Sequence, residues 1–511
     1  MLPEMIAACS RNFPSKTAFI QGRRSATWSE MDRRSTRFAC VLRALGAERG
    51  DTVAILAQER IEVYEHWFAS IKAGTVRVGI NWRYSAREML HIITDCRPKV
   101  LVVDSHCVAS LPGIAARLDE IGCHIVGFGE EHGIALDYET LLAEAGDGLE
   151  PVAYSGTEPV LCTYTSGTTG SPKGVLLNER AVATAMKETM LAIGVSPDDV
   201  WYRPNQSSWV VLIGNSSGLA NGMTMVIPDG QFQIQSFLSD IERLRVTVVL
   251  VVPTVLVRLL DEYATRHYDL SSLNRLVYGG GPITPQLIRR TLATFDCKLV
   301  QIYGMTEVTW VATLQHGDHI RGLQDKPALL TSAGRIAPHF EASVRDDDGN
   351  PVALGEIGTV WLRGPCLMNG YHKQPELTGR VLMDGGWFVT HDMGYLDEEG
   401  YLYLRDRKSF LIISGGANIY PTSVEEVIAR HPGVKEVAVV GAPDPVWGEI
   451  VVAFLVAHDP AARIDLDDVA QFCRGQLSSM EVPKRVVVVN ELPRNFTGKI
   501  DKLSLKRSLT S

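Results

Sequence analysis

The segment Tyr164-Thr165-Ser166-Gly167-Thr168-Thr169-Gly170-Ser171-Pro172-Lys173-Gly174 directly follows the apolar run Pro159–Cys162. Its glycines let the backbone curl, its hydroxyl and N–H groups are hydrogen-bond donors, and Lys173 adds a positive charge. Such a loop after a buried strand suits the oxygens of a polyphosphate. Its spacing differs from G-x-x-x-x-G-K-[ST], so it is not a Walker loop. A flexible surface loop is the plainer alternative for a segment rich in Gly, Ser and Thr.

Around this segment the composition is that of an ordinary globular protein. Of 511 residues, 45% are hydrophobic and 21% are charged, which excludes wholesale disorder. Fifty basic and 59 acidic side chains give a formal charge of -9, and this mild acidity argues against a nucleic-acid partner. Nine scattered cysteines lack C-x-x-C spacing and neighbouring histidine pairs, so neither a zinc site nor a disulfide framework is expected.

Strand-like and helix-like segments alternate over the first four hundred residues. Valine-rich runs such as Lys99–Asp104, Val246–Val252 and Leu276–Tyr278 are followed by turn residues and periodic segments such as Pro285–Phe295. This alternation predicts βαβ units and parallel sheets covered by helices on both faces. The longest apolar stretch, Val246–Leu260, is interrupted by a proline and an arginine, so we expect no transmembrane segment there.

The pattern changes after about residue 340. Alternating strand-like residues flank two turns, Asp346–Gly349 and Asp397–Gly400, which predicts an antiparallel, β-rich subdomain. From Phe410 the order becomes strand, glycine turn, helix Thr422–Arg430, two strands, helix Leu466–Leu477 and a strand, which is typical of a compact α+β unit. We therefore predict an α/β fold with a large N-terminal domain, residues 1–406, and a small C-terminal domain, residues 407–511.

The segment Tyr164–Gly174 resembles the phosphate-loop signature of the adenylate-forming superfamily, which includes acyl- and aryl-CoA synthetases, nonribosomal adenylation domains and luciferases. Four further segments match in order: YGGGP at 278–282, QIYGMTE at 301–307, GWFVTHD at 386–392 followed by Arg407, and LPRNFTGKI at 492–500. The resemblance covers essentially the whole chain. It implies that residues 1–406 form an adenylation core that binds ATP and an acid, and that residues 407–511 form a mobile lid domain.

The resemblance implies an ATP site drawn from several segments. The β- and γ-phosphates would be held by Thr165, Ser166, Gly167, Thr168, Thr169, Gly170 and Lys173. The adenine pocket and the strand beside it would supply Gly280, Gly281, Pro282, Tyr303, Gly304 and Met305. The ribose would be held by Asp392, since a carboxylate can accept from both hydroxyls, and by Arg407. A surface salt bridge is the plainer alternative for this last pair.

Three residues would carry out the adenylation chemistry by this resemblance. Attack of a carboxylate on the α-phosphate of ATP builds negative charge, so the reaction needs positioning and cations rather than a covalent nucleophile. Thr306 would bind the α-phosphate, Glu307 would ligate Mg²⁺, and Lys499 would reach the carboxylate and the α-phosphate. Carboxylate and phosphate oxygens are the ligands that Mg²⁺ prefers. A charge at a helix N-terminus is the alternative for Glu307.

In this family the small domain rotates after adenylation and presents a second face for thioester formation. Ser414, Gly415 and Gly416 resemble the glycine turn that lines the pantetheine tunnel, where a narrow thiol arm passes close to backbone. Trp447 matches a position that helps to bind CoA or supports the tunnel; a core position is the alternative. At the hinge, where the family has Asp or Lys, this chain has Ser409.

The wall of the acid pocket departs from the family pattern. The family histidine is replaced by Ser207, which lies in a polar run, 205–208, that ends at the bulky Trp209. Buried polar groups need partners, so this run predicts a short or aromatic acid with a polar substituent. The alternative is that these side chains face solvent. Gly279 and Gly304 would complete the acid site, and Trp310 would either line it or pack in the core.

These observations predict an ATP-dependent carboxylate–CoA ligase that uses ATP, Mg²⁺ and CoA. It would form an acyl-adenylate, release pyrophosphate and transfer the acyl group to CoA. A stand-alone adenylating enzyme that passes the acyl group to a carrier protein or an amine is the alternative. A silent nucleotide-binding protein is disfavoured because Lys173, Glu307 and Lys499 are all present. A cytoplasmic location is the default, since no secretory signal or S-K-L ending is visible, and a homodimer is left open.

Overall fold

The computed structural model describes residues 1–150, 152–165, 172–204, 207–208, 210–281, 283–415, 417–459, 464–494 and 499–509. They belong to two compact units. Unit 1 comprises residues 1–327, 336–341 and 363–388, and unit 2 comprises residues 328–335, 342–362 and 389–511. The predicted boundary after Asp406 falls inside unit 2, at the end of a strand, and it stays a prediction.

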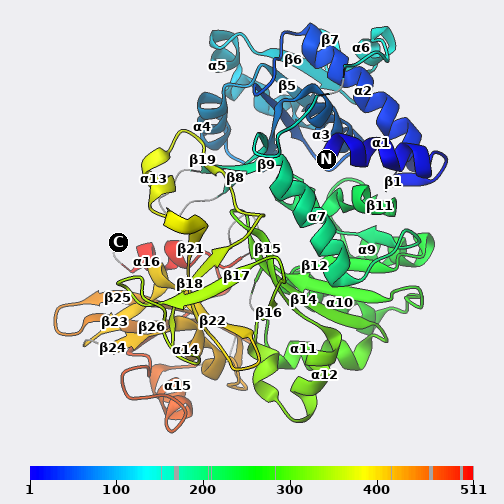
Figure 1. The fold of residues 1–511 in the computed structure, drawn as a ribbon. Helices are drawn as coiled ribbons and strands as arrows, with labels where there is room; N and C mark the ends of the chain where they lie inside the picture. The colour runs from blue at the N-terminus through cyan, green and yellow to red at the C-terminus, as the bar shows by residue number, and fades with distance from the viewer. Residues whose placement is uncertain are drawn as a thin grey trace. The chain divides into compact units, whose positions relative to one another are not determined.

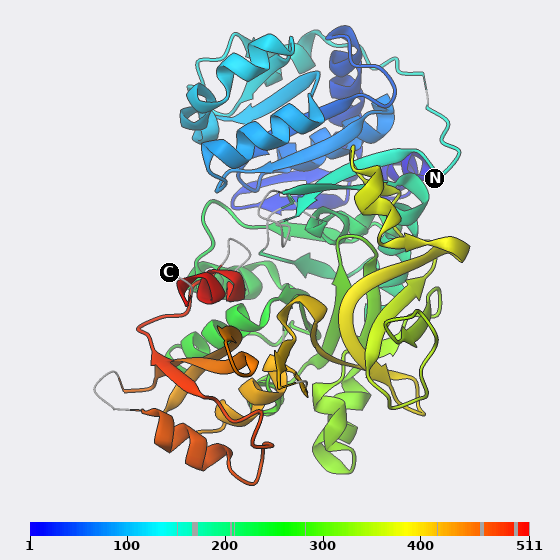
Figure 2. The ribbon, with the colours of Figure 1, turned by 90° about the vertical axis from the view of Figure 1, so that its left-hand side faces the viewer.

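The first sheet of unit 1 has eight strands in the described residues, and its strands β3 to β7 are blue and cyan in Figure 1 and Figure 2. Its order is β19 (Gly370–Tyr371), β9 (Lys173–Asn178), β8 (Pro159–Thr165), β4 (Val76–Asn81), β3 (Thr52–Ala57), β5 (Val100–Asp104), β6 (His124–Phe128), β7 (Leu136–Asp137). The strands from β8 to β7 are parallel, and β9 and β19 continue the sheet in antiparallel pairs.

The second sheet of unit 1 is also mainly parallel. Its order within the unit is β15 (Thr309–Leu314), β14 (Lys298–Met305), β13 (Arg275–Gly279), β12 (Val248–Val251), β10 (Val200–Tyr202), β11 (Thr224–Ile227), β1 (Thr17–Gln21), β2 (Arg24–Thr27). The strands from β14 to β1 run parallel, and β15 and β2 pair antiparallel at the two ends. The predicted parallel sheets are therefore confirmed.

Helices cover these sheets, and one of them lies between the two. Helix α3 (Ile61–Ala73) contacts β3 and β4 of the first sheet and β1 of the second, and each of its residues is buried. The other long helices are α2 (Trp28–Ala44), α4 (Ala86–Cys96), α7 (Glu179–Ile193), α9 (Ile234–Leu244), α10 (Pro253–Thr265) and α11 (Pro285–Thr294). Because α3 is buried on all sides between the strands that it contacts, it fixes the two sheets as layers of one core.

Unit 2 contains the β-rich part and a small α+β part. The β-rich strands follow the order β17 (Glu341–Arg345), β18 (Gly358–Arg363), β21 (Trp387–Leu396), β22 (Tyr401–Arg407), β16 (Gly334–Ile336). The predicted turn at 397–400 joins β21 and β22, and Gly400 takes the left-handed φ of 79° that such a turn needs. The predicted antiparallel subdomain is confirmed.

The C-terminal part has a sheet with one helix pair and a terminal helix. The sheet order is β24 (Ala417–Ile419), β23 (Ile412–Ser414), β26 (Gly448–Ala457), β25 (Val434–Asp444), with β27 (Arg485–Val488) beside β26. The helices are α14 (Pro421–Ile428), α15 (Leu466–Cys473) and α16 (Lys502–Ser508). Helix α15 ends earlier than predicted because Arg474 is extended and Gly475 has a φ of 78°.

Two further expectations from the sequence concern the cysteines and membrane-spanning helices. All nine cysteines are free thiols. Over the described residues, no helix combines the length and the apolar character that crossing a membrane requires.

Gly304 gives a test of the hairpin formed by β14 and β15. A Cβ on Gly304 would lie 1.9 Å from the Thr309 carbonyl oxygen, at the point where the strand register shifts. We expect Gly304→Ala to lose about 1–3 kcal/mol through overpacking and to lower the thermal unfolding midpoint. Gly317→Ala is the matched control, because its Cβ would meet no atom within 4 Å in α12 (His316–Gln324). Equal midpoints for the two variants would contradict this account.

Candidate active site

The motif segments follow the carboxyl ends of parallel strands in both sheets of unit 1. Thr165 ends β8, Gly279 ends β13, and Met305 ends β14. Ligands of open α/β sheets bind at this edge, where the loops leave the strands. The predicted phosphate, adenine and acid segments therefore all lie at the carboxyl edges of the sheets of unit 1.

The predicted phosphate loop is the connection of a β-hairpin. Thr165 at the end of β8 lies opposite Lys173 at the start of β9. The residues between them, including Ser166, Gly167, Thr168, Thr169 and Gly170, lie outside the described residues. The pairing holds Lys173 beside the first residue of the loop, and the phosphate contacts of the loop stay predictions.

Lys173 and Glu307 both lie next to Tyr371. The Lys173 ammonium is 5.7 Å from the centroid of the Tyr371 ring, and the Tyr371 hydroxyl donates a 3.0 Å hydrogen bond to Glu307 Oε1. The Glu307 carbonyl accepts from the Met368 N–H at 2.8 Å. Thr306 and Glu307 occupy the turn between β14 and β15, so the alternative that Glu307 complements a helix N-terminus is wrong.

Tyr371 was missed by the sequence reasoning. It lies in the two-residue strand β19, where it pairs with Val175 of β9, about two hundred positions away from the phosphate loop in the chain. No local pattern marks such a contact. Only its pairing with the strand that begins at Lys173 brings it to the site.

The turn after β13 leaves room for glycine alone. A Cβ on Gly279 would lie 2.4 Å from the Ile302 carbonyl oxygen, and Gly280 has a φ of 79°. Gly281 continues the turn, and Pro282 lies outside the described residues. Tyr303, Gly304 and Met305 end the neighbouring strand β14. The close approach of β14 explains Gly279, and the left-handed φ explains Gly280, without reference to a ligand.

Tyr278 anchors this turn from the buried side. Its hydroxyl lies 2.8 Å from His319 Nε2 and 2.8 Å from Gln301 Oε1. His319 Nδ1 lies 2.8 Å from the Gln315 carbonyl oxygen, so Nδ1–H donates to that carbonyl. Burial lowers the pKa of His319 to about 4, which keeps the ring neutral and this tautomer fixed.

In unit 2 the structure brings together Asp392, Arg407 and Lys499. Arg407 and Asp392 face each other across β22 and β21, with a 3.1 Å hydrogen bond from Arg407 Nε to Asp392 Oδ1. The pKa of Lys499 is lowered by loss of water and by the Arg407 guanidinium, and Asp392 raises it. The predicted ribose pair is therefore an ion pair here, within electrostatic reach of the predicted catalytic lysine.

The residues predicted for CoA also meet in unit 2. The Gly415 N–H donates a 2.7 Å hydrogen bond to the Trp447 carbonyl, and Ser414 pairs with Gly448. A Cβ on Gly415 would lie 2.8 Å from the Trp447 ring. Trp447 is 45% exposed, so a core position for it is wrong. Gly416 lies outside the described residues.

Ser207 and Ser208 are buried, so the alternative that they face solvent is wrong for both. The Ser207 hydroxyl and N–H donate to the Glu59 carboxylate at 2.6 and 2.8 Å, and Tyr64 also donates to Glu59. Trp209 and the two residues before Ser207 lie outside the described residues. The Trp310 ring nitrogen donates to Thr313 at 2.7 Å, and its ring packs on His339.

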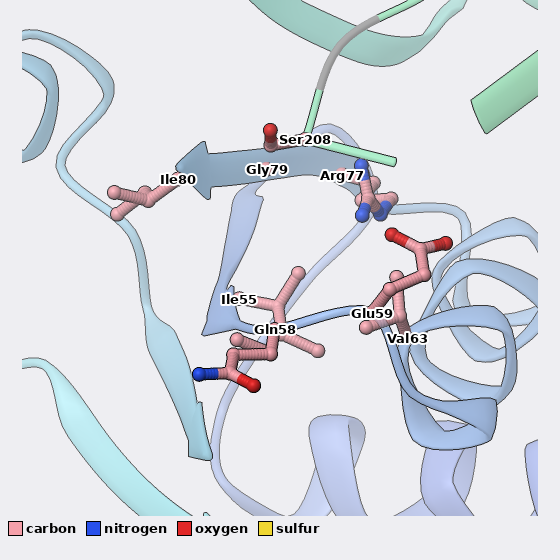
Figure 3. Close-up of a pocket in the computed structure, with 9 residues that line it drawn as sticks. Ile55, Gln58, Glu59, Val63, Arg77, Gly79, Ile80 and Ser208 are labelled. Carbon is pink, nitrogen blue, oxygen red and sulfur yellow. The ribbon is translucent and has the colours of Figure 1, made fainter. Parts of the chain in front are cut away.

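Figure 3 shows a second feature that sequence reasoning missed, the buried pair Glu59 and Arg77. Glu59 follows β3, Arg77 lies inside β4, and both are at most 5% exposed. The signal was present as a charge inside the apolar run VRVGIN, 76–81, since charged side chains are rarely buried without partners.

Comparison with known proteins gives matches along nearly the whole chain. The model described as AMP-binding enzyme matches residues 6–372, and the model of the AMP-binding enzyme C-terminal domain matches residues 423–499. The chain is 34% identical over 501 residues to a fatty acid–[acyl-carrier-protein] ligase, ScoC, of Streptomyces coeruleorubidus, covering 96% of this chain and 93% of that one.

Two further relatives differ from the first in the reactions that their names give. An indoleacetate–CoA ligase of Aromatoleum aromaticum is 34% identical over 492 residues, covering 96% of this chain and 94% of the relative. The structure of the amide bond synthetase McbA from Marinactinospora thermotolerans matches with a TM-score of 0.88 and 30% identity over 99% of both chains. These three relatives name a carrier protein, CoA and an amide bond, respectively.

The electrostatic setting of Lys499 can be tested without catalysis. Because Arg407 lowers and Asp392 raises the pKa of Lys499, we expect Arg407→Gln to raise that pKa and Asp392→Asn to lower it. Only the neutral amine is acetylated, so the midpoint of labelling by acetic anhydride should move to higher pH in the first variant and to lower pH in the second. Mass spectrometry of the Lys499 peptide measures this, with exposed Lys435 as internal reference. Shifts in the same direction would contradict the assignment.

Proposed function

The chain belongs to the AMP-binding enzyme family, and on that premise we propose that it is an ATP-dependent carboxylate–CoA ligase. In the first step an oxygen of the acid attacks the α-phosphorus of ATP, the bond to the bridging oxygen breaks, and pyrophosphate leaves. In the second step the CoA sulfur attacks the acyl carbon, AMP leaves with the electron pair, and the thiol proton passes to solvent. The products are a thioester, AMP and pyrophosphate.

The observation that carries this proposal is the arrangement of Lys173, Tyr371 and Glu307 beside the predicted phosphate loop. It offers a cation for phosphate oxygens and a carboxylate for a hard metal ion, held apart by a rigid phenol ring. In the proposed site Lys173 and the loop bind the β- and γ-phosphates, and Thr306 binds the α-phosphate. Fixed cations at the positions where charge develops are what such a reaction requires.

The donor set of Glu307 fits Mg²⁺ that arrives with the nucleotide. Mg²⁺ in such sites takes one or two carboxylates together with phosphate oxygens and waters. Among the described residues no group of three His, Cys, Asp or Glu side chains forms a metal cage, and Glu307 is a single carboxylate oriented by Tyr371. When bound, the ion would neutralise developing phosphate charge, and Tyr371 would hold the carboxylate in place for it.

In unit 2 we assign ribose binding to Asp392 and Arg407, and adenylation chemistry to Lys499. Asp392 is 8% exposed and is fixed through its N–H, which donates to Thr390 at 3.0 Å. A carboxylate so held can accept from ribose hydroxyls. Lys499 would place its positive charge on the oxygens that join the acid to the α-phosphate.

We propose CoA as the acceptor, and Ser414, Gly415, Gly416 and Trp447 as its contacts. The support is the exposed Trp447 ring packed on the Gly415 turn, which leaves a large apolar surface beside backbone. The relatives name a carrier protein and an amide bond as well as CoA. Transfer to a carrier protein or an amine is therefore the second candidate.

For the acid we propose a short or aromatic carboxylate with a polar substituent, bound beside Ser207, Trp209, Gly279 and Gly304. Ser207 uses its hydroxyl on Glu59, so it contributes by holding the wall of the pocket. A cytoplasmic location and a homodimeric state stay predictions.

The proposal is tested by ATP–pyrophosphate exchange over short-chain, aryl, hydroxy- and amino-substituted acids. Each acid that supports exchange is then incubated with CoA, with an acyl carrier protein or with an amine, and the product is identified by mass. Exchange with a CoA thioester establishes the ligase. Exchange with amide or carrier product alone selects the second candidate, and no exchange with any acid rejects both.

Lys499→Ala tests the assignment of the lysine. We expect exchange to fall by roughly 10²–10³-fold, the usual effect of removing one charge-stabilising group, while ATP affinity changes by less than about threefold. Lys435→Ala, which removes an exposed lysine from the same unit, should leave both unchanged. Near-normal exchange by the Lys499 variant would show that this lysine does not act in adenylation.

A further inference from the structure

A polar chamber lies in unit 1 where β3, β4 and the segment after β10 meet (Figure 3). We use this name for the cavity lined by Gln58, Glu59, Arg77, Gly79 and Ser208 together with apolar neighbours. Its volume is about 10 Å³, which is room for one water-sized group. The chamber joins the two sheets, because Glu59 follows β3 and its partner Ser207 follows β10.

Arg77 enters the chamber from β4 with unused hydrogen-bond donors. It is 1% exposed, and its Nε and Nη1 have no hydrogen-bond partner among the described residues. The Oγ of Ser208, which is 9% exposed, likewise has none within that part of the chain. Leaving a buried hydrogen-bond donor without an acceptor costs folding free energy, most of all when the donor is charged. Both side chains line the same small space.

Close packing holds these donors side by side. A Cβ on Gly79 would lie 2.7 Å from the Ser208 Cα and 2.9 Å from Arg77 Nη1. Glycine at 79 therefore allows the Ser208 backbone to rest on β4 beside the guanidinium. The absence of a side chain at this position of β4 lets Ser208 and the Arg77 guanidinium lie next to each other beside the chamber.

The chamber lies in a buried cluster of charged groups with an excess of positive charge. Glu59 is the one carboxylate that acts on Arg77, and its oxygens already accept from Ser207 and Tyr64. Arg203, which follows β10, acts on the same Glu59 and Tyr64, and its Nε has no partner among the described residues. Burial lowers the pKa of each guanidinium to about 10, so both are charged at neutral pH. Two cations thus face one carboxylate.

We propose that the chamber binds an anionic group at the far end of the acid substrate, with an oxygen of that group accepting from Arg77 and Ser208. The inference rests on the proposed function and narrows its substrate class to acids that carry a second negative group. Such a group accepts hydrogen bonds from the unused donors and also balances the positive charge. A water molecule would satisfy the donors but would not balance the charge. Its place at the carboxyl edges of both sheets is where ligands bind in such folds.

A free inorganic anion offers the same chemistry as the far end of a substrate. The experiment separates the two sources by using matched acids and halide salts. Exchange kinetics are measured for butanoate against butanedioate, pentanoate against pentanedioate, and 3-phenylpropanoate against its para-carboxy derivative. We expect at least one diacid to exceed its partner about tenfold or more in kcat/KM, the effect of one charged hydrogen bond.

Arg77→Met removes the charge and keeps the length of the side chain. We expect it to reduce kcat/KM for the preferred diacid by about 10–100-fold, mainly through KM, and for the monoacid by less than about threefold. Arg77→Lys should restore part of the preference. Arg34→Met is the matched control, because Arg34 also pairs with a buried carboxylate of unit 1, Glu65, at 2.5 Å. It should lower stability without changing the ratio between acids.

Removing Arg77 takes away one of the two cations that act on the buried Glu59, which can destabilise the fold. The double variant Glu59→Gln, Arg77→Met removes one negative and one positive charge, so the net charge of the buried groups is unchanged, and it should fold and still lose the preference for diacids. Glu59→Gln alone should keep that preference.

Three outcomes distinguish the proposed function, this inference and the binding of a free anion. No exchange with any acid overturns the proposed function, and this inference with it. Exchange with an unchanged ratio between monoacids and diacids in the Arg77 variants overturns this inference alone. A thermal midpoint that rises with sodium bromide in the wild type but not in Arg77→Met, without any preference for diacids, assigns the chamber to a free anion and also overturns it.

Discussion

The hydrogen bond from Tyr371 to Glu307 is the contact on which the candidate site depends. Tyr371 belongs to the edge of one sheet of unit 1, and Glu307 to the hairpin turn at the end of the other. A second link, from Ser207 to Glu59, joins the loops after β10 and β3. Because both links connect carboxyl edges, loops that are far apart in the chain share one region, and the buried helix α3 contacts strands of both layers.

The sequence predicted most of this frame because its strongest signals are local. The motif at 164–174 is recognisable within one short segment, and Gly280 and the turn at 397–400 follow from backbone requirements within a few residues. Parallel strands could be predicted from valine-rich runs that alternate with helices. Tyr371, Glu59 and Arg77 could not be placed, because their roles arise from pairing between distant strands. A lone charge in VRVGIN indicates a partner but does not say which residue it is.

Three alternatives failed for physical reasons that the sequence did not contain. Glu307 lies in a hairpin turn, since β15 follows β14 directly and no helix begins there. Trp447 is exposed because β26 starts immediately after it and the ring rests on Gly415 at the sheet end. Ser207 is buried because its hydroxyl and its N–H both donate hydrogen bonds to Glu59. In each case a long-range contact overrode a sound local expectation.

The charges of unit 2 suggest how nucleotide and lysine are coupled in the proposed reaction. Arg407 and Asp392 act on Lys499 in opposite directions, and loss of water also lowers its pKa. A triphosphate bound near these residues adds negative charge, which favours the protonated lysine. Ribose hydroxyls that donate to Asp392 leave its charge in place, so the carboxylate continues to support the ammonium. In the proposed site, Asp392 would therefore both bind the ribose and support the charge on Lys499 that the transfer of the acid to the α-phosphate requires.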